Sequence, residues 1–125
     1  MIFGTGVDII EIARIGKSLG KYPDRFEQKV FTENEIEYCR SKADPVKHFA
    51  ARFAVKEAVL KCLGSGMTQG IAWKDIEVEN EDTGKPLLKL YGQGEQVFKD
   101  LNLKAIHISI SHDKAYAIAH AIAER

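Results

Sequence analysis

The stretch from Pro45 to Gly64, PVKHFAARFAVKEAVLKCLG, constrains the fold more than any other part of the chain, because its spacing is that of one long helix. Asp44 is placed to cap the first N–H groups, and Pro45 suits the first helical position. Gly64 suits the left-handed residue that often ends a helix. Apolar residues occupy nearly the whole circumference. A helix of this kind is typically buried at the centre of a domain.

Glu57 lies in the middle of one apolar side of this helix, and Lys61 stands one turn further on. A carboxylate in such a place is costly unless it meets a cation or a metal. One interpretation is an i,i+4 ion pair with Lys61, in the favourable order. The other is a metal ligand beside a phosphate-binding lysine. The stripe expected to face solvent contains three other polar residues, His48, Arg52 and Lys56.

Asp8 lies in a predicted strand over residues 2–10 that is rich in Ile, Val and Phe. Gly4 and Gly6 share its side of the strand, because side chains alternate with a period of two. Glycine in a strand often marks a close approach by a ligand or another backbone. The alternative is a strand-end Asp that caps the next helix. A second carboxylate buried elsewhere, such as Glu57, favours the metal interpretation.

The remaining pattern predicts an α+β single domain over residues 1–125, with a mainly antiparallel sheet packed on the long central helix. Thr32 and Glu35 have the spacing of a capping box, which starts a helix. The other predicted helices cover residues 11–20, 24–30 and 93–101, and the later strands cover residues 75–80, 86–91, 105–111 and 115–123.

The last two strands have faces of different character. Alanines at 117, 119, 121 and 123 form a small-residue face against which a helix or another subunit can pack closely. Such a face, or a free sheet edge, is one reason to expect a closed oligomer. His112 stands at a strand end, where a polar side chain is exposed and useful, although a solvated turn histidine fits the same position.

The charges balance at 18 acidic and 18 basic residues, so the composition gives no argument for nucleic acid. A charged partner must therefore meet a local basic patch. The first residues carry no basic leader, and no apolar run approaches the ~20 residues that span a bilayer. We therefore expect no membrane partner. Cys39 and Cys62 have no metal-like spacing, and we interpret them as reduced thiols of a cytoplasmic protein.

Four segments together resemble a known family over essentially the whole chain. They are GVDIIEIARI at residues 6–15, FTENEIEYC at 31–39, FAARFAVKEAVLKCLGSG at 49–66 and SISHD at 109–113. Each alone is weak, but the ordered set at this chain length is specific. The sequence resembles the holo-[acyl-carrier-protein] synthases, which are 4'-phosphopantetheinyl transferases of the short bacterial type.

The resemblance implies that the 4'-phosphopantetheine arm of coenzyme A is transferred to a serine of apo acyl carrier protein, in support of fatty acid biosynthesis. Adenosine 3',5'-bisphosphate leaves. Family members use Mg²⁺ and usually form homotrimers with active sites between subunits. The family's metal ligands correspond to Asp8 and Glu57, and Glu57 and Lys61 are its catalytic positions here. Glu57 or a water near the metal could accept the serine proton.

The resemblance places coenzyme A near His112, and Lys61, Gly64 and Ser65 are further candidate contacts with its phosphates. A glycine-rich turn after a helix can bring backbone N–H groups to a phosphate, although it is also an ordinary helix stop. Arg52 is a further candidate. It lies about 140° around the helix from Glu57, so we expect it outside the Glu57 pocket unless a neighbouring subunit supplies it.

Carrier-protein docking needs a basic surface, because acyl carrier proteins are acidic along the helix after the modified serine. Arg14 is the first candidate, since it leaves the apolar stripe of the first helix and points to solvent. Arg25 follows, with Lys29 one turn beyond it; ordinary solvated surface is the alternative for all three. Two other functions stay open for the whole chain: a non-catalytic binding module with a structural Glu57–Lys61 pair, and a metal-dependent phosphohydrolase using Asp8, Glu57 and water.

Overall fold

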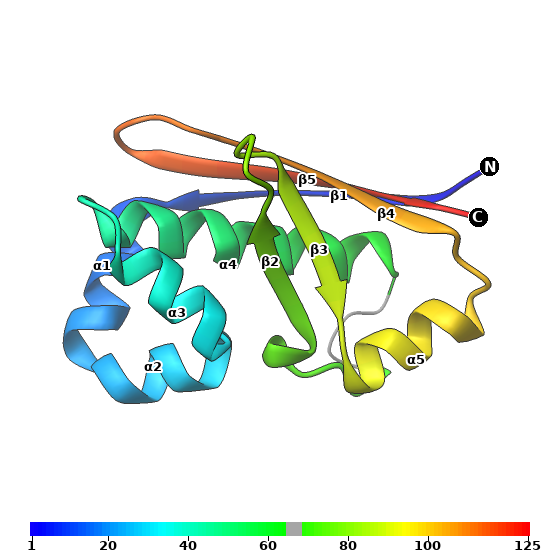
Figure 1. Ribbon diagram of the computed structural model, residues 1–125, viewed down its shortest axis with the longest axis horizontal. Coiled ribbons are helices and arrows are strands. Elements are labelled where there is room, and N and C mark those ends of the chain that lie inside the picture. Colours follow the sequence, from blue (N-terminus) through cyan, green and yellow to red (C-terminus); the bar gives the residue numbers. More distant parts are fainter. Residues whose placement is uncertain (65–68) are drawn as a thin grey trace.

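A three-stranded antiparallel sheet lies along one long helix in the computed structural model, which describes residues 1–64 and 69–125. The sheet has the order β1 (Ile2–Glu11), β5 (Tyr116–Glu124), β4 (Ala105–His112), and the helix α4 spans Pro45–Cys62. Helices gather at one end of α4, whereas α5 (Gly92–Asp100) lies at the other (Figure 1). The predicted fold class, an antiparallel sheet packed on a long central helix, is confirmed.

Two glycines bring β1 against α4. A Cβ atom on Gly6 would overlap the carbonyl oxygen of Ala58, and one on Gly4 would overlap that of Cys62. The close approach that the glycines predicted is therefore an approach by another backbone. Because Asp8 shares this side of β1, it is held over α4 as well.

The alanine face of β5 packs on α4 of the same chain, because Ala119, Ala121 and Ala123 belong to the buried core with Val55 and Val59. Of the two occupants considered for this face, the helix is therefore the one present. The opposite sheet face exposes apolar side chains instead. They include Val7 and Ile9 from β1 and Tyr116 and Ile118 from β5.

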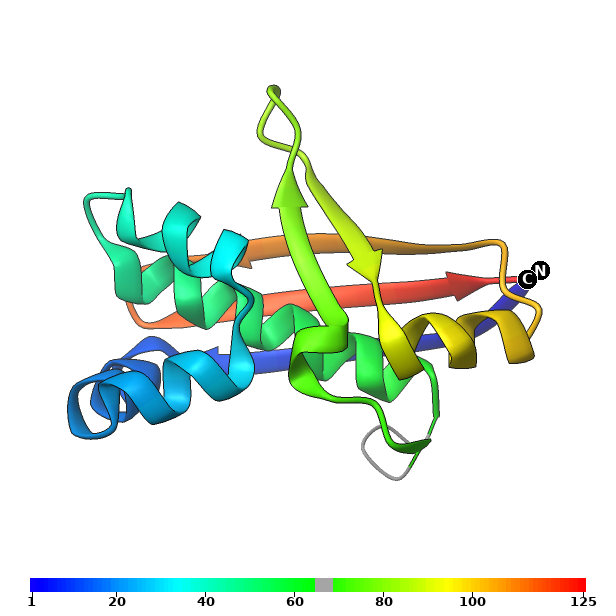
Figure 2. The same ribbon diagram turned by 60° about the horizontal axis from the view of Figure 1, so that its bottom comes forward.

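Three short helices and a hairpin cover the other side of α4. The helices are α1 (Ile12–Lys21), α2 (Pro23–Val30) and α3 (Glu33–Arg40), and β2 (Ile76–Asn80) pairs with β3 (Pro86–Leu90) as a second, two-stranded sheet. Its tip projects beyond the rest of the molecule (Figure 2). A 3₁₀ turn at Trp73–Asp75 precedes β2. The capping box predicted at the start of α3 is present, with Thr32 accepting from the Glu35 N–H.

Two local predictions about α4 were wrong. Asp44 makes no side-chain capping bond, although Pro45 does begin the helix. The stripe expected to face solvent is largely covered, since Arg52 and Lys56 are buried and His48 is half-buried. The reason is tertiary: α3 and the β2–β3 hairpin pack over that stripe, which helical periodicity alone does not reveal.

The two chain termini are joined at the end of the sheet (Figure 1). The Met1 ammonium donates to the Arg125 carbonyl at 2.9 Å, and the Arg125 N–H donates to the Met1 carbonyl at 2.7 Å. Within residues 1–64 and 69–125, no helix combines the length and the apolar character that a membrane span requires.

Candidate active site

Asp8, Glu57 and Lys61 come together where β1 crosses the second half of α4. The Lys61 Nζ atom donates to Asp8 Oδ1 at 2.9 Å and to the Val7 carbonyl at 3.1 Å. In the described part of the chain, Lys61 therefore pairs with Asp8 on the neighbouring strand and not with Glu57 on its own helix. The i,i+4 interpretation of Glu57 and Lys61 is not what the structure shows.

The second oxygen of Asp8 is buried, and no partner for it exists in the described part of the chain. Burial raises the pKa of Glu57, the negative charge of Asp8 raises it further, and the Lys61 ammonium opposes them. Two carboxylates near one another with one partly exposed lysine therefore form a site with excess negative charge. Such a site stabilises an added cation, because a buried carboxylate oxygen without a partner is costly.

A cation at this site would have two carboxylate ligands from the chain. No cluster of three or more His, Cys, Asp or Glu side chains with metal-binding geometry occurs among the residues that the structure describes. This ligand set excludes a typical structural zinc site, which uses four protein ligands. It fits Mg²⁺, which is usually held by one or two carboxylates and completes its shell with waters and substrate phosphates.

A groove of about 240 Å³ opens on the covered side of α4, where the first half of the helix meets the hairpin tip. Arg52 and His112, two of the candidate coenzyme A contacts, both line it. The other lining residues are Tyr38, His48, Ala51, Asn80, Gly84, Pro86 and Ile110. Four segments of the chain therefore meet here: α3, α4, the hairpin and the end of β4.

Arg52 is fixed in this groove by neutral partners. Its Nη2 atom donates to Asn80 Oδ1 at 2.5 Å, and its guanidinium lies 4.1 Å from the centre of the Tyr38 ring. Its Nε atom is buried without a partner among the described residues. In that part of the chain no carboxylate forms a salt bridge with the guanidinium, so its positive charge remains available to an anion in the groove.

Two histidine rings lie edge to face near Arg52, with the His48 and His112 ring centres 6.5 Å apart and the ring planes at 74°. Burial lowers the pKa of His48, and the positive charges of Arg52 and Lys42 lower it further. An anion in the groove would relieve this repulsion. Sequence reasoning missed His48, Asn80 and Tyr38 as groove residues; the only signal was the polar stripe of α4, which had been assigned to solvent.

Four other residues were predicted as site residues: Gly64, Ser65, Arg14 and Arg25. Gly64 has the left-handed backbone expected at a helix end, with φ of 102°. Ser65, a predicted coenzyme A contact, lies outside the described residues. Arg14 and Arg25 are exposed on α1 and α2, while Ile15 and Leu19 of α1 are buried. The structure therefore agrees that Arg14 leaves the apolar stripe.

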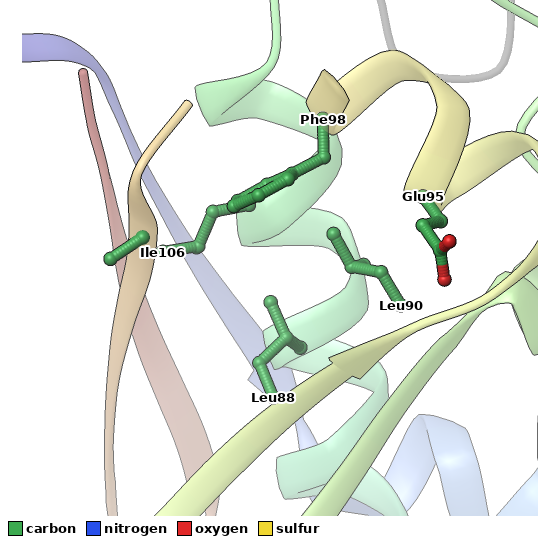
Figure 3. A pocket seen from close by; sticks show the side chains of 6 residues that line it. Leu88, Leu90, Glu95, Phe98 and Ile106 are labelled. Atoms are coloured by element: carbon green, nitrogen blue, oxygen red, sulfur yellow. The ribbon is translucent and has the colours of Figure 1, made fainter. Parts of the chain in front are cut away.

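A separate hollow, of about 380 Å³, lies between β3, α5 and β4 (Figure 3). Apart from Glu95 at one side, the side chains that line it are apolar, and Leu88, Leu90, Phe98 and Ile106 are directed into it. Among the residues that the structure describes, no predicted site residue contributes to it. Its chemistry does not suit a charged nucleotide or phosphate, so the candidate site is the carboxylate cluster together with the groove.

Comparisons with known proteins decide the family. The model of the 4'-phosphopantetheinyl transferase superfamily matches residues 4–121. The chain belongs to this superfamily. A curated relative named holo-[acyl-carrier-protein] synthase, from Geobacter sp. (strain M21), is 50% identical over 125 residues, which is 100% of both chains. The family that the sequence resembled is thus confirmed.

Solved structures of family members have the same fold. The holo-[acyl-carrier-protein] synthase of Neisseria meningitidis is 26% identical, with a TM-score of 0.93 over 100% of both chains. That of Helicobacter pylori, solved in complex with coenzyme A, is 30% identical, with a TM-score of 0.85 over 96% of this chain and 99% of that one.

Proposed function

We propose that the chain transfers the 4'-phosphopantetheine group of coenzyme A to a serine of apo acyl carrier protein. Adenosine 3',5'-bisphosphate is the other product. Membership of the superfamily and relatives named holo-[acyl-carrier-protein] synthase over the full chain support this activity. The observation in this structure that supports it most directly is the unpartnered Asp8 oxygen beside Glu57 and Lys61, because phosphoryl transfer depends on charge neutralisation and positioning.

Asp8 and Glu57 would hold Mg²⁺ in this proposal, and the fit rests on the orphaned Asp8 oxygen and on the raised pKa of Glu57. When bound, Mg²⁺ supplies positive charge that polarises the pyrophosphate of coenzyme A. Lys61 is half exposed, at 53%, and its ammonium donates to Asp8 Oδ1 at 2.9 Å. Its ammonium is therefore placed to neutralise charge that develops on a transferred phosphate.

The Arg52 groove would hold the nucleotide end of coenzyme A. Arg52 donates to Asn80 and keeps its positive charge for a phosphate, while His112 and His48 line the same wall. This assignment retains the predicted contacts Arg52 and His112, although the groove that they line in one chain does not include Glu57. Lys61 and Gly64 stand at the other end of α4, so they belong with the pantetheine phosphate in this proposal.

A homotrimer with shared active sites accounts for that separation. The exposed apolar face of the sheet, with Val7 and Ile9 more than half exposed, is a surface that a second copy would cover. One copy's groove and another's carboxylates would then act on the same coenzyme A. Sedimentation equilibrium at micromolar concentration tests the assembly: a fully active monomer would rule out a shared site.

Carrier docking is assigned to Arg14 and Arg25, which are exposed on consecutive helices directly after the strand that contains Asp8. We also propose a cytoplasmic role in fatty acid biosynthesis. The two cysteines are free thiols, buried in the core, which suits a reducing compartment.

One incubation tests the activity against its alternatives. The protein is mixed with apo acyl carrier protein, coenzyme A and Mg²⁺, and the carrier mass is followed by mass spectrometry. Addition of the phosphopantetheine mass with release of adenosine 3',5'-bisphosphate is the expected result. Mg²⁺-dependent loss of coenzyme A without carrier modification would indicate a phosphohydrolase instead. An unchanged mixture would favour a non-catalytic binding module.

A further inference from the structure

A second lysine–carboxylate pair, Lys56 with Glu35, lies in the interior of the molecule and is separate from the Asp8–Lys61 pair. Both side chains are 0% exposed, and Lys56 Nζ donates to Glu35 Oε1 at 2.7 Å. Lys56 also donates to the carbonyls of Val30 at 2.7 Å and Trp73 at 3.1 Å. All three donors of the ammonium are therefore used.

Glu35 ties α3 to two other elements. Its Oε1 atom accepts from the Thr32 N–H at 3.0 Å as well as from Lys56 on α4, and its Oε2 atom accepts from the Val78 N–H of β2 at 2.9 Å. Thr32, the N-cap of α3, adds a second tie to β2, because its hydroxyl donates to Glu77 Oε2 at 2.5 Å. This buried network therefore holds α3 and β2 on α4.

The same three elements form the walls of the Arg52 groove. Tyr38 is on α3, Arg52 is on α4 one turn before Lys56, and Asn80 is on β2 two residues after Val78. Asn80 accepts from Arg52 and donates to the Gly84 carbonyl at 3.0 Å, which fixes the hairpin tip. The register of β2 at Val78 thus sets where Asn80 meets Arg52.

We propose that the Glu35–Lys56 pair is a positioning device for nucleotide binding: it sets the distance between the hairpin, α3 and α4, and thereby the shape of the Arg52 groove. The pair does not touch the substrate, and it acts through Val78 and Asn80. This inference rests on the proposed function, because it assumes that the groove receives the adenosine 3',5'-bisphosphate part of coenzyme A.

A buried pair is not by itself a reason to expect stability, because its desolvation offsets much of the attraction. Burial lowers the pKa of Lys56, and the contacts to Glu35 oppose that shift only in part. An apolar pair of similar volume would fill this interior as well. What an apolar pair would lack is the set of directional bonds to Thr32, Val78, Val30 and Trp73.

The variant Glu35→Gln tests the proposal with little change in shape. An amide offers one acceptor atom, so it cannot accept from both the Val78 N–H and the Thr32–Lys56 side. Val59→Ala is the matched control: it weakens the α4 core from a fully buried position without touching the pair. Both variants are titrated with adenosine 3',5'-bisphosphate by calorimetry and assayed for transfer.

We expect Glu35→Gln to raise the KM for coenzyme A and the Kd for adenosine 3',5'-bisphosphate about tenfold, with kcat within about threefold of the parent. Val59→Ala should change neither constant. Equal constants for Glu35→Gln and the parent, or equal changes in both variants, would overturn the positioning role. A parent that neither binds the nucleotide nor modifies the carrier would overturn the proposed function and this inference together.

Amide exchange in the parent protein gives a second readout that does not depend on a variant's folding. Coupling between two sites is reciprocal, so a nucleotide in the groove must also stabilise the bonds of the Thr32 and Val78 N–H groups to Glu35. We expect saturating adenosine 3',5'-bisphosphate to slow exchange at both amides by several-fold or more. Unchanged exchange at both amides, with the nucleotide bound, would contradict the proposal.

Discussion

Lys56 and Glu57 are neighbours on α4, yet they belong to two lysine–carboxylate clusters of opposite character. Lys56 and Glu35 are 0% exposed, and all donors of the ammonium are used. Lys61 and Asp8 are 53% and 14% exposed, and one Asp8 oxygen has no partner in the described part of the chain. The first cluster is complete without a ligand, whereas the second lacks positive charge.

This contrast separates a structural from a chemical use of the same residue types. A closed network fixes elements relative to one another, because breaking any bond leaves a buried polar group unsatisfied. In the open cluster the pKa of Glu57 is raised and the second Asp8 oxygen is buried without a partner in the described part of the chain, so added positive charge is favourable there. Each cluster should therefore respond to mutation in its own way, one through stability and positioning and the other through chemistry.

The largest expected effect is on transfer at the open cluster. Asp8→Ala and Glu57→Ala should each lower kcat by at least about 100- to 1,000-fold, because each removes a carboxylate that would hold Mg²⁺ beside the reacting phosphate. Stability should stay within about 1 kcal/mol of the parent, since neither change empties the core. A folded alanine variant that transfers at the parent rate would show that the cluster is not the reaction site.

The next largest effect is on stability at the closed pair. Lys56→Met should lower the free energy of unfolding by about 3–5 kcal/mol, because it leaves the Glu35 charge buried without its cation. The matched change Lys61→Met should cost less than about 1 kcal/mol, because that pair is partly exposed, and should instead slow transfer. Urea unfolding and carrier assays on both variants measure this. Equal destabilisation by the two changes would erase the contrast.

A third prediction concerns Arg14, an exposed residue outside both clusters. Arg14→Glu should raise the KM for carrier protein about tenfold through lost attraction and new repulsion, and leave the affinity for coenzyme A nearly unchanged. Added salt should weaken carrier binding by the parent more than by the variant. Identical carrier KM and salt slope in the two proteins would place the docking surface elsewhere.

The smallest expected effect is the change in stability caused by Glu57→Gln. Because the pKa of Glu57 in the folded protein is above its ordinary value of 4.5, the folded state holds that proton more tightly than the unfolded state. The parent therefore loses stability as pH rises through the folded pKa. We expect the variant to have a slightly higher Tm than the parent at pH 7, with the advantage shrinking toward pH 4. A Tm difference that does not vary with pH would contradict this assignment.

The open cluster was predictable from sequence because its signals are local. Gly4, Gly6 and Asp8 alternate so that they lie on the same face of one strand, and Glu57 interrupts an apolar side of a helix. The glycines indicated a close approach, and the structure shows the α4 backbone there. What pairs with Lys61 was not predictable, since helical spacing pointed to Glu57 and the partner comes from a strand 53 residues away.

The closed pair was missed for a related reason. Helical periodicity placed Arg52 and Lys56 on one stripe, and a charged stripe usually faces solvent. The contacts that bury this stripe come from elements distant in sequence. Glu35 of α3 lies 21 residues before its partner Lys56, and Asn80 of β2 lies 28 residues after its partner Arg52. The capping box at Thr32 and Glu35 was recognised, but its further bonds to Lys56 and Val78 are tertiary.

Metal binding measured directly at the two clusters tests the central claim, that the open cluster and not the closed pair holds the catalytic cation. Mn²⁺ stands in for Mg²⁺ because carboxylates suit both ions, and electron paramagnetic resonance reports its free and bound forms with coenzyme A at a concentration that saturates every variant. Glu35→Gln should bind Mn²⁺ as tightly as the parent. Asp8→Asn should bind it at least tenfold more weakly, a loss of about 1.4 kcal/mol in binding free energy. Parent-strength binding in Asp8→Asn would contradict the account.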